Sequence, residues 1–238
     1  MILGFLTGFG KVVIYFIGCV VILSLLTHFY KKVPKEVFRK SLHLILIFSL
    51  LVFLYAFENW WLAALASLAF MVLAYLVISL AEKMIKGFSE YIHERKKGEI
   101  KNSLLLAFMM FALMIGIGWG WLGEKWLVIV CVLAWGFGDG AAALVGKKYG
   151  KRKIKARYAD GKKTVEGTVT MFLVSFVTVL LILLLNANFA WYGYLITALL
   201  AAVVTAIVEL CTKNGDDTVT CPLAAAAVIL PLVALFTI

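Results

Sequence analysis

The chain contains about eight long apolar runs with few charged side chains. They cover residues 11–30, 42–57, 60–81, 104–122, 126–146, 167–185, 191–211 and 221–237. An α-helix needs about twenty apolar residues to cross the hydrocarbon core of a bilayer, and only helices and closed barrels can span lipid. The runs therefore predict an all-α fold, a polytopic membrane helix bundle with about eight transmembrane helices.

The composition favours a single membrane-embedded domain over residues 1–238. Hydrophobic residues make up 64% of the 238 residues, and the mean hydropathy is +1.02. Soluble proteins contain only about half apolar residues, so a soluble domain of this length could not bury so much apolar surface. The connections between the runs are also too short to form a separate soluble domain.

Basic residues lie almost entirely on alternate connections. Of the 23 Lys and Arg residues, all except Lys11 and Lys125 fall on or beside the first, third, fifth and seventh connections. Because cytoplasmic connections carry an excess of Lys and Arg, we predict that these connections are cytoplasmic and that both termini lie outside. Attraction to anionic lipid then accounts for the formal net charge of +10 without a nucleic-acid partner.

Asp139 lies inside the fifth apolar run. An ionisable side chain below the headgroups costs roughly 2.5–3.5 kcal/mol on insertion scales, so it is retained where it faces a polar cavity, a metal ion or a partner charge. A hydrogen bond between helices is the structural alternative. Small residues recur around it every four positions, in the rows Gly138, Ala142, Gly146 and Gly136, Gly140. They favour close helix packing, and they would also let a phosphate approach the backbone.

The connection after this run carries residues suited to phosphate. Lys147, Lys162, Lys163 and Thr164 precede a predicted helix start, where charge, backbone N–H groups and a hydroxyl are available. Glu166 adds a carboxylate that could bind a metal ion or order a lysine. The pattern GxxxxGK[ST] is absent, which excludes a P-loop.

Two further polar segments are predicted at the same face. Arg39 and Lys40 lie just before the second run, and His43 lies one helical turn after Arg39. Snorkelling towards the headgroups is the alternative role for the two basic side chains. Near the C-terminus, Glu209 ends the seventh run and Asp217 precedes the eighth.

Carboxylates with few histidines favour Mg²⁺ bound together with a nucleotide phosphate. Mg²⁺, Lys and Arg are also the groups that neutralise a transferring phosphoryl group. The residues alone thus predict an enzyme at the membrane face that handles phosphates.

The spacing of the polar residues forms a set of motifs across most of the chain. They read Arg39-Lys40-x-x-His43, Gly138-Asp139-Gly140-x-Ala142-x-x-x-Gly146-x-x-x-Gly150 and Gly161-Lys162-x-Thr164-x-Glu166-Gly167, followed by Asp217 before Pro222-Leu223. In this order they resemble the CTP-dependent lipid-alcohol kinases, the family of dolichol kinase, phytol kinase and the yeast-type diacylglycerol kinase.

The resemblance implies transfer of the γ-phosphoryl group of CTP to the hydroxyl of a membrane lipid alcohol, with Mg²⁺, at the cytoplasmic face. The resemblance places activity-critical residues at Arg39, Lys40, Asp139 and Gly146. Together with the reading of the residues themselves, it leads us to predict three sets. The catalytic residues are Asp139, Arg39, Lys40 and His43; the nucleotide-binding residues are Gly138, Gly140, Gly146, Lys147, Lys162, Lys163 and Thr164; the metal ligands are Asp139, Glu166 and Asp217. The base is Asp139 or His43. Some relatives carry Asn in the last motif, where this chain has Asp216 and Asp217.

Two alternatives remain open on the sequence. A phosphatidate cytidylyltransferase-like enzyme would make a CDP-lipid, although the Pro-Gly-His-Gly-Gly run typical of that enzyme is absent. A transporter would use Asp139 and Glu209 as coupling residues, but the internal repeats common in transporters are not evident. The apolar runs do not distinguish a polyprenol, phytol or diacylglycerol as the acceptor.

Overall fold

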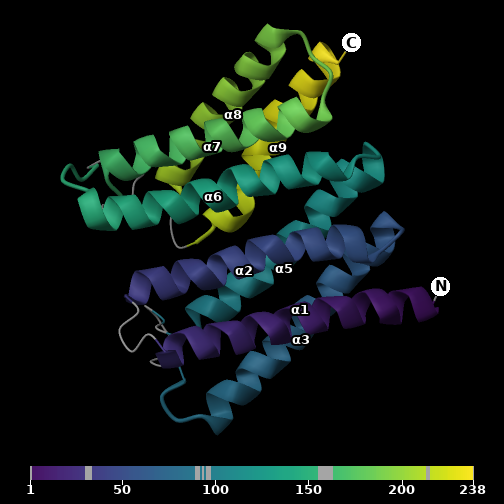
Figure 1. The fold of residues 1–238 in the computed structure, drawn as a ribbon, viewed down its shortest axis with the longest axis vertical. Helices are drawn as coiled ribbons and strands as arrows, with labels where there is room; N and C mark the ends of the chain where they lie inside the picture. Colours follow the sequence, from purple (N-terminus) through teal and green to yellow (C-terminus); the bar gives the residue numbers. More distant parts are fainter. Residues whose placement is uncertain are drawn as a thin grey trace. The chain divides into compact units, whose positions relative to one another are not determined.

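The computed structural model describes residues 2–29, 34–88, 92, 94, 98–154, 163–212 and 215–237, and these fold almost entirely into helices (Figure 1). Along the chain they are α1 (Ile2–Phe29), α2 (Lys35–Ala56), α3 (Trp60–Met84), α5 (Glu99–Met114), the π-helix η1 (Ile115–Trp121), α6 (Lys125–Tyr149), α7 (Val165–Asn186), α8 (Trp191–Cys211) and α9 (Asp217–Phe236). Extended pairing in this part of the chain is limited to isolated bridges, Lys153 with Thr164 and Phe189 with Thr237. The predicted all-α class is confirmed.

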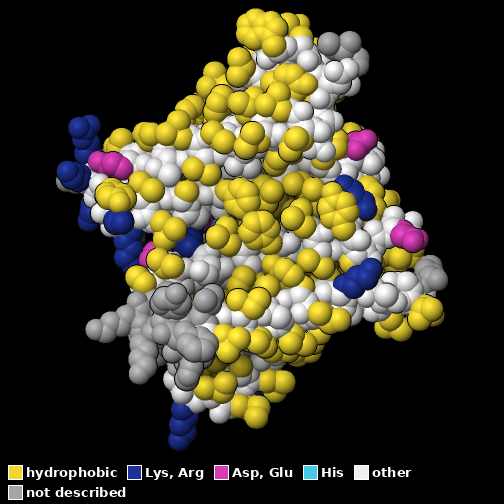
Figure 2. Space-filling model, viewed as in Figure 1, with side chains coloured by type: hydrophobic (Ala, Val, Ile, Leu, Met, Phe, Trp, Pro, Cys, Tyr) yellow, Lys and Arg dark blue, Asp and Glu magenta, His cyan; other side chains and the backbone are white. Residues whose placement is uncertain are grey.

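Eight spans in the described residues are long and apolar enough to cross a membrane, as predicted, and the fourth combines α5 with η1. Large hydrophobic side chains are exposed along them, such as Leu3 on α1 and Leu185 on α7, and Figure 2 shows hydrophobic side chains over most of the viewed face. Such exposure would cost about 25 cal/mol per Å² in water and is satisfied by lipid. The chain is an integral membrane protein.

Several helices extend beyond the apolar runs that predicted them. α2 begins at Lys35 instead of residue 42, so the segment from Arg39 to His43 lies wholly within it, and α9 begins at Asp217 instead of residue 221. A run of apolar residues marks only the part of a helix that crosses hydrocarbon. Beyond it the backbone continues to form helical hydrogen bonds at the headgroup level, where charged side chains reach water.

The chain divides into two compact units, Met1–Leu122 and Gly123–Ile238, and each consists of membrane-crossing helices. In the first unit α3 packs on α5 and η1, and α2 packs on α1 and α3. Its core is aromatic: the rings of Phe53, Phe70 and Phe108 lie with centroids 5.3–6.2 Å apart. Ser67 Oγ donates to the Phe108 carbonyl at 2.8 Å, which joins α3 to α5 without leaving a buried hydroxyl unsatisfied.

In the second unit α6 is the central helix, and it packs against α7, α8 and α9. Residues 130–136 of α6 are all buried. Ser175 of α7 donates from Oγ to the Ala134 carbonyl at 2.7 Å, where small residues allow the two helices to approach.

Each unit has a charged end and an aromatic end. In the second unit, Lys163 Nζ donates to the Thr212 carbonyl at 3.2 Å, so the α6–α7 and α8–α9 connections meet at one end. At the other end the Phe189 ring lies 5.2 Å from that of Tyr194 and 6.2 Å from that of Phe236.

The first unit has the same arrangement. Arg39 of α2 and Glu99 of α5 form an ion pair of 3.2 Å at the charged end, whereas the Trp60 ring packs on Gly120 at the other end. Trp121 and Trp191 are exposed at the aromatic ends, as residues of an interfacial aromatic belt would be. Within each unit the ion pairs therefore lie at one end and the exposed tryptophans at the other, and the cytoplasmic orientation stays a prediction.

Candidate active site

Asp139 lies in the second half of α6, and its side chain is half-buried. Its charge acts on Glu209 of α8 and on Cys221 of α9. The carboxylate therefore lies close enough to the end of α8 and the start of α9 for its charge to act on them.

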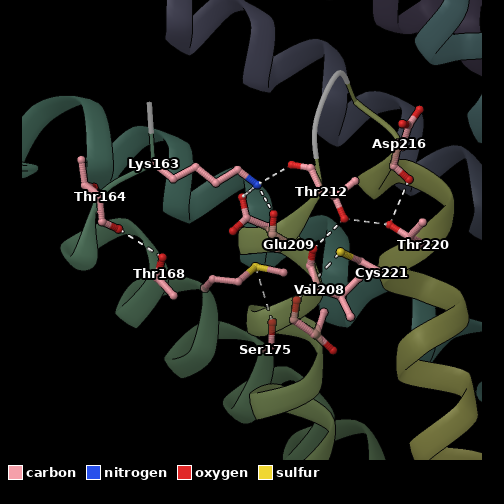
Figure 3. Close-up of polar contacts among 12 residues, drawn as sticks. Lys163, Thr164, Thr168, Ser175, Val208, Glu209, Thr212, Asp216, Thr220 and Cys221 are labelled. Atoms are coloured by element: carbon pink, nitrogen blue, oxygen red, sulfur yellow. Dashed lines mark hydrogen bonds and ion pairs between the residues drawn. The ribbon is translucent and has the colours of Figure 1, made fainter. Parts of the chain in front are cut away.

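Glu209 is the buried acid of this region, with only 8% of the residue exposed. Its Oε1 lies 2.9 Å from Lys163 Nζ, and the charges of both Asp139 and Asp217 act on it. We call Asp139, Glu209 and Asp217 the carboxylate cluster. Figure 3 shows Lys163 reaching Glu209 from the end of the α6–α7 connection, so segments far apart in sequence supply the charges at this end of the unit.

The start of α9 is held beside the end of α8 by hydroxyl groups. Thr212 Oγ1 donates to the Val208 carbonyl at 2.6 Å and lies 3.2 Å from Thr220 Oγ1, which contacts the Asp216 carbonyl at 3.1 Å. These contacts place Asp217 in the first turn of α9, where a negative charge interacts favourably with the helix dipole. The third member of the carboxylate cluster is thus positioned by the junction of α8 and α9.

The α6–α7 connection narrows to a paired neck. Ile154 N donates to the Lys163 carbonyl and Val165 N to the Arg152 carbonyl, each at 2.9 Å. Directly after Lys163, Thr164 caps α7 by accepting the Gly167 N–H at 3.1 Å. Exposed basic side chains gather at this end of the unit: Lys147, Lys148, Lys151, Arg152 and Lys153.

Two of the predicted nucleotide-binding glycines have a packing role. A Cβ at Gly138 would lie 2.5 Å from both Met171 Sδ and Ser175 Oγ, and one at Gly146 would lie 3.0 Å from Thr164 Oγ1. α7 therefore occupies the space beside them, and the Thr164 hydroxyl, predicted to bind nucleotide, is a buried helix cap. The structure thus supports the packing alternative at these positions.

Gly140 differs from its neighbours. It is buried, yet a Cβ added to it would have no heavy atom within 4 Å. Among the described residues, a methyl group could therefore be added at Gly140 without a clash, and the packing role found at Gly138 and Gly146 does not extend to this glycine.

The other residues predicted in the α6–α7 connection have different surroundings. Glu166 Oε2 accepts the backbone N–H of Arg152 at 3.4 Å, so its carboxylate supports the neck. Lys147 is exposed in the last turn of α6. Lys162 lies outside the described residues.

Arg39, Lys40 and His43 all lie on α2 in the first unit. Arg39 is held between two carboxylates, with Nη1 at 2.6 Å from Glu36 Oε1 and Nη2 at 3.2 Å from Glu99 Oε1. Lys40 is buried and His43 half-buried. Arg39 thus joins α2 to α5 through Glu99.

The donor set fits a metal ion only in part. Among the described residues, no group of three or more His, Cys, Asp or Glu side chains is placed to hold a metal. Glu209 pairs with Lys163, and Asp139 and Asp217 are the carboxylates that the sequence predicts as metal ligands. Mg²⁺ usually takes one or two protein carboxylates and completes its octahedron with water and phosphate oxygens. The chemistry therefore fits Mg²⁺ bound together with a nucleotide.

Glu209 was not among the predicted site residues, although it belongs to the carboxylate cluster. The sequence carried a usable signal: it is an ionisable residue at the end of an apolar run, on a connection of the same parity as the one after Asp139. Its pairing with Lys163 could not be read from spacing.

Comparison with known proteins agrees with these motifs. Residues 1–212 match the cytidylyltransferase family. The chain is 32% identical over 123 residues to the phytol kinase of Synechocystis sp.; the match covers 50% of this chain and 52% of that protein, so the chain is matched over about half the length of this relative. No solved structure matches. The resemblance to the lipid-alcohol kinases is confirmed by the phytol kinase match, and the chain belongs to the cytidylyltransferase family.

Proposed function

We propose that the protein is a CTP-dependent lipid kinase that phosphorylates the hydroxyl group of a membrane lipid alcohol. The observation that carries the proposal is the carboxylate cluster at the basic end of the second unit, in a chain similar to a phytol kinase. Acidic and basic side chains at the end of a membrane-embedded helix bundle suit a reaction between a water-soluble nucleotide and a lipid hydroxyl group.

In the proposed reaction, the lipid hydroxyl oxygen bonds to the γ-phosphorus of CTP as the bond from that phosphorus to the β–γ bridging oxygen breaks. CDP leaves, and a base accepts the hydroxyl proton. Asp139 takes this role if it does not hold the metal ion, and His43 is the second candidate. Lys147 and Lys162 hold the triphosphate, and Gly140 lets it approach the backbone of α6. Mg²⁺ held by Asp139 and Asp217 would neutralise phosphate charge. The lipid enters from the bilayer between helices.

The test uses CTP labelled on different phosphates. Purified protein in liposomes is incubated with Mg²⁺ and, separately, phytol, a polyprenol, diacylglycerol or phosphatidate. A kinase transfers the γ-label to a lipid alcohol and releases CDP in equal amount. The family match also favours a second candidate, a cytidylyltransferase, which would transfer the α-label to phosphatidate and release pyrophosphate.

The γ-label in a lipid alcohol is the expected result, and the α-label in phosphatidate would replace the proposal with the second candidate. Transfer of neither label would leave the transporter alternative. A parallel series with γ-labelled ATP measures donor preference.

The proposed cytoplasmic orientation predicts opposite labelling of the two ends of the second unit. In a variant with Cys19 and Cys211 replaced by serine, single cysteines are introduced as Lys148→Cys or Asn188→Cys, both at exposed positions. A membrane-impermeant maleimide should label Asn188→Cys in intact cells and Lys148→Cys only after permeabilisation, since positive connections face the cytoplasm. The reverse pattern would invert the topology.

A further inference from the structure

Lys163 uses its full hydrogen-bonding capacity on the end of α8. A lysine ammonium group carries three N–H donors. Three acceptors lie around Lys163 Nζ: Glu209 Oε1 at 2.9 Å, the Thr212 carbonyl at 3.2 Å and the Glu209 carbonyl (Figure 3). A phosphate oxygen could bind this ammonium only by displacing one of them.

The two carbonyl contacts give Lys163 the role of a helix cap. The last four carbonyls of an α-helix lack partners within the helix, and a cation at this end also interacts favourably with the helix dipole. Lys163 thus stabilises the last turn of α8, the turn that carries Glu209 and leads into the junction with α9.

The backbone of Lys163 is fixed as well. Its carbonyl accepts the Ile154 N–H at 2.9 Å in the neck, and the next residue, Thr164, caps α7. The lysine therefore connects the neck and the start of α7 to the end of α8. Its backbone is held by the neck and its ammonium group by α8.

The ion pair with Lys163 also offsets one of the negative charges of the carboxylate cluster. Glu209 is buried, and both Asp139 and Asp217 act on it with like charge. Without the ammonium of Lys163, the buried Glu209 carboxylate would face like charges with no neutralising partner, and the end of α8 would move.

We propose that Lys163 and Glu209 act as a positioning pair that holds the carboxylate cluster in its reactive arrangement, and that Lys163 is not a phosphate ligand. The inference rests on the proposed kinase function and revises the role that the sequence predicted for this lysine. A positioning residue acts through the placement of Asp139 and Asp217, so its loss should affect kcat and leave nucleotide binding nearly unchanged.

The test compares Lys163→Met, Glu209→Gln and the double variant in steady-state kinetics with varied CTP. Each single variant should lower kcat by about 10- to 100-fold, the scale of a misplaced reacting group, with the KM for CTP within about twofold of wild type. The double variant should lose no more than the worse single variant, because the two residues act as a unit. Lys163→Arg, which keeps charge and donors, should recover part of the rate.

Lys125→Met, a lysine at the opposite end of the second unit, is the matched control and should keep both constants. A rise of about tenfold or more in the KM for CTP with Lys163→Met but not with Glu209→Gln would make Lys163 a phosphate ligand and overturn the proposal. Additive losses in the double variant, or unchanged kcat in both single variants, would also overturn it.

Hydrogen exchange separates this inference from the proposed function. Lys163→Met should speed amide exchange at residues 209–212, where α8 loses its cap, and leave residues 130–134 of α6 unchanged. Unchanged exchange at 209–212 would refute the positioning pair whether or not the protein is a kinase. Absence of γ-phosphoryl transfer by the wild-type protein would count against the kinase function alone.

Discussion

Replacing Asp139 by asparagine should lower the rate of phosphoryl transfer by roughly 100- to 1,000-fold, the scale for losing one preorganised charged or polar group in an active site. Asparagine has nearly the same shape, so α6 should keep its packing against α8 and α9. The variant loses the negative charge that the proposed reaction uses to accept a proton or to hold Mg²⁺. The measurement is initial transfer of γ-label from CTP to the lipid alcohol that serves the wild-type protein.

Glu124→Gln is the control for this experiment. Glu124 is an exposed acid at the other end of α6, and its side chain makes no capping hydrogen bond. The control should turn over at the wild-type rate, while both proteins insert and show the same thermal stability. Wild-type turnover by Asp139→Asn would show that Asp139 takes no part in the reaction. If the variant instead loses thermal stability along with activity, Asp139 has a structural role.

The second large effect concerns stability. Gly138→Ala should destabilise the protein by about 1–3 kcal/mol, the usual range for overpacking a filled interior. The added methyl group would lie 2.5 Å from Met171 Sδ and Ser175 Oγ. Neither atom can move without loss, because Met171 is fully buried and the Ser175 hydroxyl is bonded to the Ala134 carbonyl at 2.7 Å.

Gly140→Ala is a matched comparison on the same helix. Gly140 is also buried, but its Cβ would meet no heavy atom within 4 Å. Thermal unfolding in detergent should therefore show a clear decrease for Gly138→Ala and none for Gly140→Ala. Equal stabilities would show that α6 and α7 do not pack as closely as the structure places them.

The membrane-spanning architecture followed from the sequence because it depends on local properties. Each apolar run satisfies its own backbone within a helix, so length and hydrophobicity suffice to identify it, and the run at 191–211 coincides with α8. The alternation of basic connections followed for the same reason, since charge counts need no knowledge of packing. Helix ends were less predictable: α2 and α9 continue through charged residues beyond the hydrocarbon.

The site was predicted only in part. Asp139 stood out because a carboxylate inside an apolar run carries a large transfer cost. The glycines around it had two possible roles on the sequence, and the positions of Met171 and Ser175 favour packing at Gly138. Arg39 likewise has neighbours that spacing does not reveal: its partner Glu99 lies 60 residues away in sequence.

The number and position of the membrane spans, and the connections on which most basic residues lie, could be read from the amino-acid pattern alone. The tertiary structure decided how the charged ends are organised. It assigned Lys163 to Glu209 across 46 residues, placed Asp139 and Asp217 beside that pair, and left room for a methyl group at Gly140. The difference arises because the transfer of a segment into lipid depends only on that segment's own residues. An ion pair depends on two side chains that are far apart in sequence and that only the packing of helices brings within hydrogen-bond distance.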